Sequence, residues 1–125
     1  MKQDKEERRK EQIREILDKS LELRDLILNS DDYTRYQREL QELKGYEETY
    51  RRVNEYRRRN LGVQLLEDAD KANEEARKLY TEYADVLSEP LVARFMIMEQ
   101  TLCKTMRKVQ NQVFENIDLD ISYMD

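Results

Sequence analysis

The feature that most constrains the fold is an apolar stripe in the segment 89–117, EPLVARFMIMEQTLCKTMRKVQNQVFENI. Apolar residues recur there every three or four positions, which is the spacing of one face of an α-helix. Pro90 suits the first turn of a helix, where its missing N–H costs no hydrogen bond. The pattern predicts a helix of about 27 residues, roughly 40 Å long, whose apolar face other helices must cover. The stripe consists of Leu91, Phe95, Met98, Leu102, Met106, Val109, Val113 and Ile117.

The composition also favours helices. Of 125 residues, 41% are charged, while Gly occurs twice and Pro once. Such a chain has many helix formers and few turn residues, and no alternating run bounded by turns predicts a strand. We therefore predict an all-α protein, an antiparallel bundle of about four to five long helices without strands. Because long helices with narrow stripes bury little surface alone, we expect association with a like or unlike partner.

The first half of the chain predicts three helices. The first covers about 5–28 and ends at Asn29, a candidate left-handed terminal residue. Ser30 is a candidate N-cap for a second helix over about 31–43. A third helix is expected over about 46–65, followed by a bend or short loop.

Residues 65–87 contain a heptad seam, with apolar or small residues at alternating steps of four and three. Alanines in the seam let a neighbouring helix approach closely. The seam suits packing within a bundle, and the alternative is a contact between chains. Its residues are Leu65, Ala69, Ala72, Ala76, Leu79, Tyr83 and Val86.

We divide the chain into three parts. Residues 1–12 are a charged N-terminal extension without an apolar stripe, 13–117 are the helical bundle, and 118–125 are an acidic C-terminal tail. The tail is expected to be frayed. Its alternation of apolar and acidic residues also suits a short docking peptide.

Charge and targeting signals indicate a cytoplasmic protein. The start of the chain does not resemble a signal peptide, and no apolar run is long enough for a membrane span. A single cysteine allows no internal disulfide. The net charge is −5, and residues 66–89 carry three basic and eight acidic side chains. No segment has the positive excess that a phosphate-binding surface needs, which makes RNA an unfavoured partner.

The residues offer little for catalysis. There is no histidine, so the commonest general base and metal ligand is missing. Two glycines do not make a phosphate-binding loop. Cys103 lies on the apolar face and is expected to be a core residue, with a reactive or ligating thiol as the alternative. We predict that the protein is not an enzyme and has no cofactor, metal or catalytic residue.

One basic cluster stands out, and Arg51, Arg52, Arg58 and Arg59 are the candidate partner-binding residues. They repeat at seven positions, which predicts one helix face. A solvated, salt-bridged face is one interpretation. A patch for an acidic protein partner and an RNA-binding patch are the others.

Two segments resemble the YlbF/YmcA family of small bacterial helical proteins. In ILDKSLELRDLILNSDDYTRYQ (16–37) a helix is followed by a small polar turn, an acidic residue and two aromatic residues. The segment SEPLVARFMIMEQTLCKTMRKVQNQV (88–113) is similar to the family's last helix. The likeness spans about residues 13–115. The matching residues are Ser30, Asp32, Tyr33, Tyr36, Pro90, Val92, Phe95, Glu99 and Leu102.

The resemblance implies a regulatory, non-catalytic helical bundle that self-associates or pairs with relatives. It implies a role in competence, sporulation and biofilm development, in a complex that assists the membrane-associated endoribonuclease RNase Y in mRNA processing. Expected partners are a second copy, YlbF/YmcA-type sister subunits and RNase Y. Some members are associated with iron–sulfur clusters, but this chain offers only Cys103. The alternatives are a structural helical homo-oligomer and a weak RNA-binding protein that uses the Arg51–Arg59 cluster.

Overall fold

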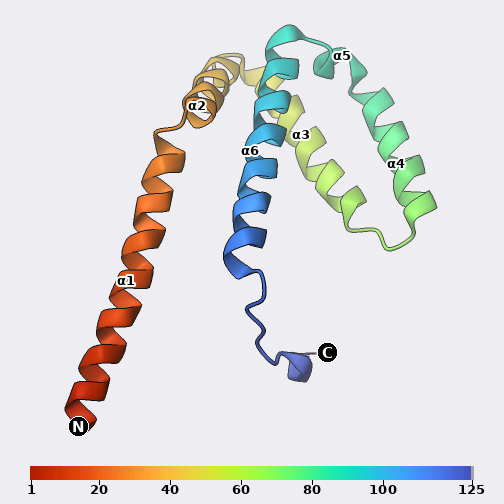
Figure 1. Cartoon of the computed structure of the whole chain (residues 1–125). Helices are drawn as coiled ribbons and strands as arrows, with labels where there is room; N and C mark the ends of the chain where they lie inside the picture. The colour runs from red at the N-terminus through yellow and green to blue at the C-terminus, as the bar shows by residue number, and fades with distance from the viewer. Residues whose placement is uncertain (125) are drawn as a thin grey trace.

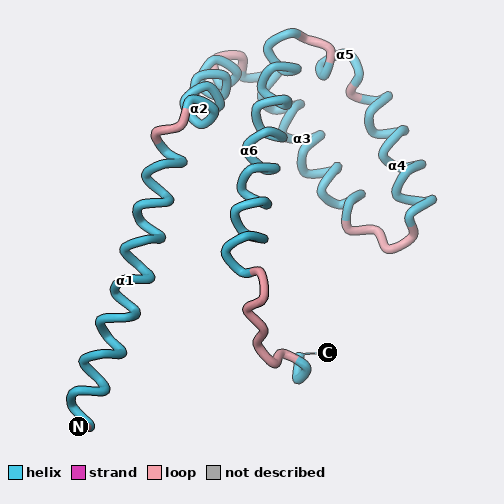
Figure 2. Tube along the Cα trace, in the orientation of Figure 1, coloured by secondary structure: helices cyan, strands magenta, loops and turns pink. Residues whose placement is uncertain are grey.

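The computed structural model describes residues 1–124, and its regular elements there are all helices (Figure 1, Figure 2). The predicted all-α class is confirmed. Along residues 1–124 the elements are α1 (Lys2–Leu28), α2 (Asp31–Lys44), α3 (Glu47–Gln64), α4 (Ala69–Glu82), α5 (Ala84–Leu87), α6 (Pro90–Phe114) and the 3-10 turn η1 (Ser122–Met124).

Local sequence signals set where these helices begin. The Ser30 side chain accepts a hydrogen bond from the Tyr33 N–H at 3.2 Å, which confirms Ser30 as the N-cap of α2. Asp68 caps α4 in the same way by accepting from the backbone of Asp70 and Lys71. Pro90 occupies the first position of α6, as predicted. Within residues 1–124 no helix has both the length and the apolar character needed to cross a bilayer.

The end of α1 differs from the prediction. Asn29 has φ −96°, so the expected left-handed conformation is wrong. Its side-chain amide donates to the Asp25 carbonyl oxygen at 2.8 Å, and its backbone N–H donates to the same oxygen at 3.0 Å. Because the terminal carbonyl already has these donors, the backbone does not need a left-handed residue to satisfy it.

The seam over 65–87 does not lie on one continuous helix, and the predicted bend or short loop after α3 is present. Leu65 closes α3 and is exposed, and the Asp68 cap delays the next helix to Ala69. The helix is then interrupted at Tyr83, whose φ and ψ are −105° and 12°. Leu79 and Val86, on either side of this break, both reach the core. The second half of the seam therefore packs within the chain, as the bundle interpretation predicts.

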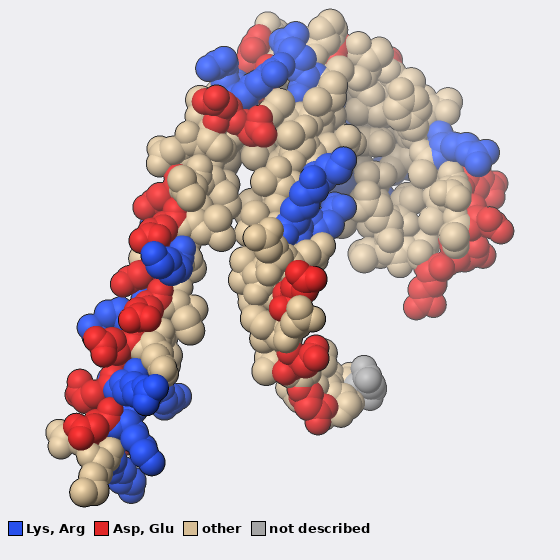
Figure 3. Space-filling model, in the orientation of Figure 1, with Lys and Arg blue, Asp and Glu red and all other residues tan. Residues whose placement is uncertain are grey.

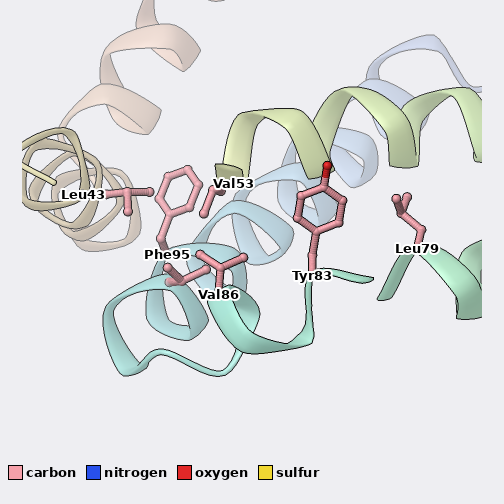
Figure 4. Close-up of a cluster of buried hydrophobic side chains, with 7 residues drawn as sticks. Leu43, Val53, Leu79, Tyr83, Val86 and Phe95 are labelled. Atoms are coloured by element: carbon pink, nitrogen blue, oxygen red, sulfur yellow. The ribbon is translucent and has the colours of Figure 1, made fainter. Parts of the chain in front are cut away.

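The core is small and lies between α2, α3, α5 and α6, with α4 beside α3 (Figure 4). The Phe95 ring is fully buried at its centre and stacks on the Tyr36 ring, with centroids 5.6 Å apart and planes at 27°. The buried cluster consists of Leu43, Val53, Leu79, Tyr83, Val86, Val92 and Phe95.

Two long segments project from this core (Figure 1). We call α2, α3, α4, α5 and residues 90–102 the head, and residues 103–114 the distal part of α6. No residue of α1 is buried. The long stripe of α6 is likewise buried only in its first half, because the helix extends beyond the neighbours that cover it.

Candidate functional site

Two of the four predicted arginines hold the head together. Arg52 donates to both carboxylate oxygens of Asp85, at 2.6 and 3.1 Å. Arg59 donates to Glu82 at 2.9 Å and to the Tyr83 hydroxyl at 3.2 Å. Both guanidinium carbons lie 5.6 Å from the centre of the Tyr83 ring. These contacts fasten the α4–α5 region to α3 through charge-assisted hydrogen bonds and cation–π contacts.

The other two predicted arginines differ from each other. Arg51 pairs within α3 with Glu48 at 2.6 Å and Glu55 at 3.2 Å. Arg58 is exposed and has no ion pair within residues 1–124. The structure thus brings Arg51, Arg52 and Arg59 into ion pairs and leaves Arg58 accessible. Partner binding by the four stays a prediction.

These ion pairs predict a loss of stability in acid. Hydrogen bonds from Arg52 hold the pKa of Asp85 below its ordinary value, and those from Arg59 do the same for Glu82. A lowered folded-state pKa stabilises the fold above the unfolded values, about 4, and this contribution is lost as the pH falls through the folded values. We therefore expect the melting temperature, followed by circular dichroism, to be level near neutrality and to fall below about pH 4.

The control is the variant Arg52→Gln with Arg59→Gln. It lacks both guanidiniums, so its melting temperature should fall less than that of the wild type over the same acid range. An equal fall in both proteins would show that other groups cause the acid sensitivity.

A groove of about 950 Å³ lies between α3 and α6. Its lining includes the apolar side chains of Leu61 and Met106, and the basic side chains of Arg58, Lys104 and Arg107. These three basic residues have no ion pair within the described part of the chain. Figure 3 shows basic side chains gathered beside the middle of α6, on its side toward α4. An apolar lining with unpaired cations suits an acidic protein segment.

One ion pair holds the two walls of the groove together. Arg57 of α3 pairs with Glu99 of α6, donates to Asn54 at 2.9 Å, and lies over the Phe95 ring with its guanidinium carbon 5.3 Å from the centroid. Among the described lining residues Glu99 is the one acid, so this pair leaves the lining with a positive excess. Burial, with the Glu99 carboxylate adding to it, raises the pKa of the Tyr36 hydroxyl beside the pair.

Cys103 lines the same groove and is exposed, so its predicted place in the core is wrong. It follows Leu102 directly, and neighbouring residues on a helix diverge by about 100°. Cys103 therefore lies beside the apolar stripe of α6 and lines the groove. Among residues 1–124 no three side chains of His, Cys, Asp or Glu gather as they would around a metal ion.

Lys104 and Arg107 were not among the site residues predicted from the sequence. Residues 100–114 contain three basic residues and no acidic one, which is a signal for a local positive surface. The groove itself was not visible, because it depends on how α3 and α6 are placed against each other.

The uncovered apolar faces form the second candidate surface. α1 exposes a row of large aliphatic side chains, and the distal part of α6 and the turn after it expose a second group. On α1 these are Ile13, Ile16, Leu17, Leu21, Leu26 and Leu28. On the C-terminal segment they are Met106, Val113, Phe114 and Ile117. Rows of exposed large apolar side chains of this kind are typical of protein interfaces.

Comparison with known families finds a match over most of the chain. A family model described as control of competence regulator ComK, YlbF/YmcA, matches residues 16–118. No curated protein and no solved structure matches the chain. The match covers most of the chain and confirms the resemblance found in its sequence. The chain therefore belongs to the YlbF/YmcA family of regulatory proteins.

Proposed function

We propose that this protein is a non-catalytic adaptor, acting through protein contacts in a cytoplasmic complex that assists RNase Y in mRNA processing. One observation carries the proposal: α1 has an apolar stripe and no buried residue. A helix gains most of its stability in a protein from packing an amphipathic face. A regulatory chain that leaves such a face uncovered needs a partner to cover it.

The proposed partners are a second copy of the chain, YlbF/YmcA-type sister subunits and RNase Y. A stable interface takes about 20–30 residues from each side. The ten exposed apolar residues named on α1 and on the C-terminal segment supply the apolar centre of such an interface, and their polar neighbours supply its rim. Both surfaces belong to one chain and project from the same head (Figure 1), so one partner is able to contact both.

The observations favour protein partners over RNA. Arg51, Arg52 and Arg59 already neutralise acidic neighbours, and the chain as a whole has a net charge of −5. Nucleic-acid binding draws most of its affinity from cations that neutralise phosphates. A purely structural homo-oligomer is the remaining alternative, and capture of partners from the native cell separates it from an adaptor.

The test uses three tagged proteins expressed in the native cell: wild type, Ile16→Glu and Arg14→Glu. Ile16 is 68% exposed and lies in the apolar stripe of α1, whereas Arg14 is a charged residue of the same helix. Because neither residue is buried, both variants should keep the melting temperature of the head. Crosslinking followed by capture should recover RNase Y and sister subunits with wild type and Arg14→Glu, and lose them with Ile16→Glu.

Two results would contradict the proposal. Absence of RNase Y from the wild-type capture would remove the link to mRNA processing. Equal capture by Ile16→Glu and Arg14→Glu would show that the α1 stripe is not the contact. Light scattering on the purified protein tests self-association separately, and a monomer at micromolar concentration would exclude a second copy as the partner.

A further inference from the structure

We propose that the groove between α3 and α6 binds the C-terminal tail of this chain, residues 117–124, folded back along α6. The stripe of α1 does not line the groove, whereas Met106, in the distal part of α6, belongs both to the groove and to the proposed partner surface. Docking of the tail in the groove goes beyond the proposed function, and its test uses the isolated chain, in which no partner covers either surface.

Charge is the first argument. Three unpaired basic residues, Arg58, Lys104 and Arg107, line the groove, where the pair of Arg57 with Glu99 is internally neutral. Residues 117–124 contain two acidic side chains, Asp118 and Asp120, and no basic one. Opposite charges on the two surfaces favour their encounter and set the orientation of the bound segment.

The apolar residues of the tail are the second argument. Leu119, Ile121 and Tyr123 alternate with polar residues, so an extended tail directs all three to one side. They are 79%, 57% and 82% exposed, and the tail buries none of them elsewhere. The groove offers apolar side chains, among them Leu61 and Met106, for this side of the tail.

The length of the chain after α6 is the third argument. Asn116 has φ 64°, a left-handed conformation that ends the helix, and the Ile117 N–H donates to the Phe114 carbonyl oxygen at 3.2 Å. Extended, residues 117–124 span about 26 Å. Lys104 lies ten residues before Phe114, about 15 Å along the helix axis, so the tail is long enough to reach it.

The same chain is the favoured source of the tail. A segment tethered next to its site is present there at an effective concentration of about millimolar, which a second copy does not reach at ordinary protein concentrations. In the structure the tail continues beyond the end of α6 (Figure 1), and its described residues are exposed. The groove then has two arrangements, open to an acidic partner or covered by the tail, and a partner must displace the tail to enter.

Disulfide trapping tests this in the full chain, because the one cysteine, Cys103, is exposed in the groove. A folded-back tail covers the distance from the end of α6 to Cys103 in about five residues, which brings Ile121 near it. In the variant Ile121→Cys, oxidised glutathione should therefore join Cys103 and the new cysteine in a disulfide within one chain. The rate of this reaction in native buffer should be at least fivefold higher than in urea, where the chain is unfolded. Lys10→Cys in α1 is the control and should form no disulfide within one chain.

Two matched charge changes on α6 sharpen the test. Arg107→Glu, in the Ile121→Cys background, should slow trapping at least fivefold, because it reverses a cation in the groove. Lys108→Glu makes the same change one residue later, in a hollow at the end of α6, and should alter the rate less than twofold. Equal slowing by both would show that net charge is responsible and would overturn the proposal.

Three further outcomes would overturn it. A rate in buffer no higher than in urea means that the tail does not dock. A disulfide that forms only between chains assigns the tail to a second copy. The third outcome has two parts: the Ile121→Cys chain forms no disulfide with Cys103, and the full chain binds a single-stranded RNA whose binding Arg107→Glu abolishes. That result would assign the groove to nucleic acid.

Discussion

Replacing Phe95 with alanine should lower the free energy of unfolding by about 3–5 kcal/mol. The Phe95 side chain is fully buried, stacks on Tyr36 at 5.6 Å, and lies beneath the Arg57 guanidinium at 5.3 Å. Removing the ring loses its transfer free energy, leaves a cavity in a core of few residues, and removes both ring contacts. Urea denaturation followed by circular dichroism measures the loss.

The chain offers a matched control on the same helix. Phe114 is 62% exposed at the end of α6, so Phe114→Ala should cost less than about 0.5 kcal/mol in the isolated chain. Both proteins should be compared at low concentration, where association does not hide the difference. Similar losses for the two substitutions would contradict the core described here.

The contrast between Phe95 and Phe114 also shows what periodicity predicts. The stripe of α6 identified a helix and its inward face, and Phe95 and Met98 are buried as that pattern requires. The same stripe predicts that Met106 and Val113 are covered by other helices too, yet both are exposed. Periodicity tells which side of a helix faces a neighbour, and the length of the neighbour decides how far the burial extends.

Helix boundaries, which depend on nearby residues, were predictable from the sequence, whereas contacts between distant residues were not. Ser30 as a cap and Pro90 as a helix start depend on neighbours within a few residues, and both predictions are confirmed. Arg51, Arg52, Arg58 and Arg59 were expected to share one face. In the structure Arg52 and Arg59 point to the α4–α5 region, while Arg58 lines the groove beside α6. Their partners lie up to 33 positions away in the chain, where sequence spacing gives no information.

An ion pair between α2 and α6, in which the carboxylate is buried and the guanidinium is exposed, was also invisible in the sequence. Glu39 is 8% exposed and is the buried charged residue among residues 1–124. It accepts a hydrogen bond from Arg94 Nε at 3.4 Å, and the two residues are 55 positions apart. A buried carboxylate is tolerated when a cation compensates for its lost hydration.

Arg94→Met should therefore cost about 1–3 kcal/mol, because it keeps the length of the side chain but leaves the Glu39 carboxylate buried without its partner. The double variant Glu39→Leu with Arg94→Met removes the uncompensated charge and should recover most of that loss. Urea denaturation of the wild type, the two single variants and the double variant gives the coupling energy between the two residues. If Arg94→Met cost less than about 0.5 kcal/mol, or if the two single losses simply added, Glu39 would be stabilised by something other than Arg94. A positive coupling would instead show that the contact between α2 and α6 depends on this pair. That contact holds α6, which forms one wall of the groove, against α2.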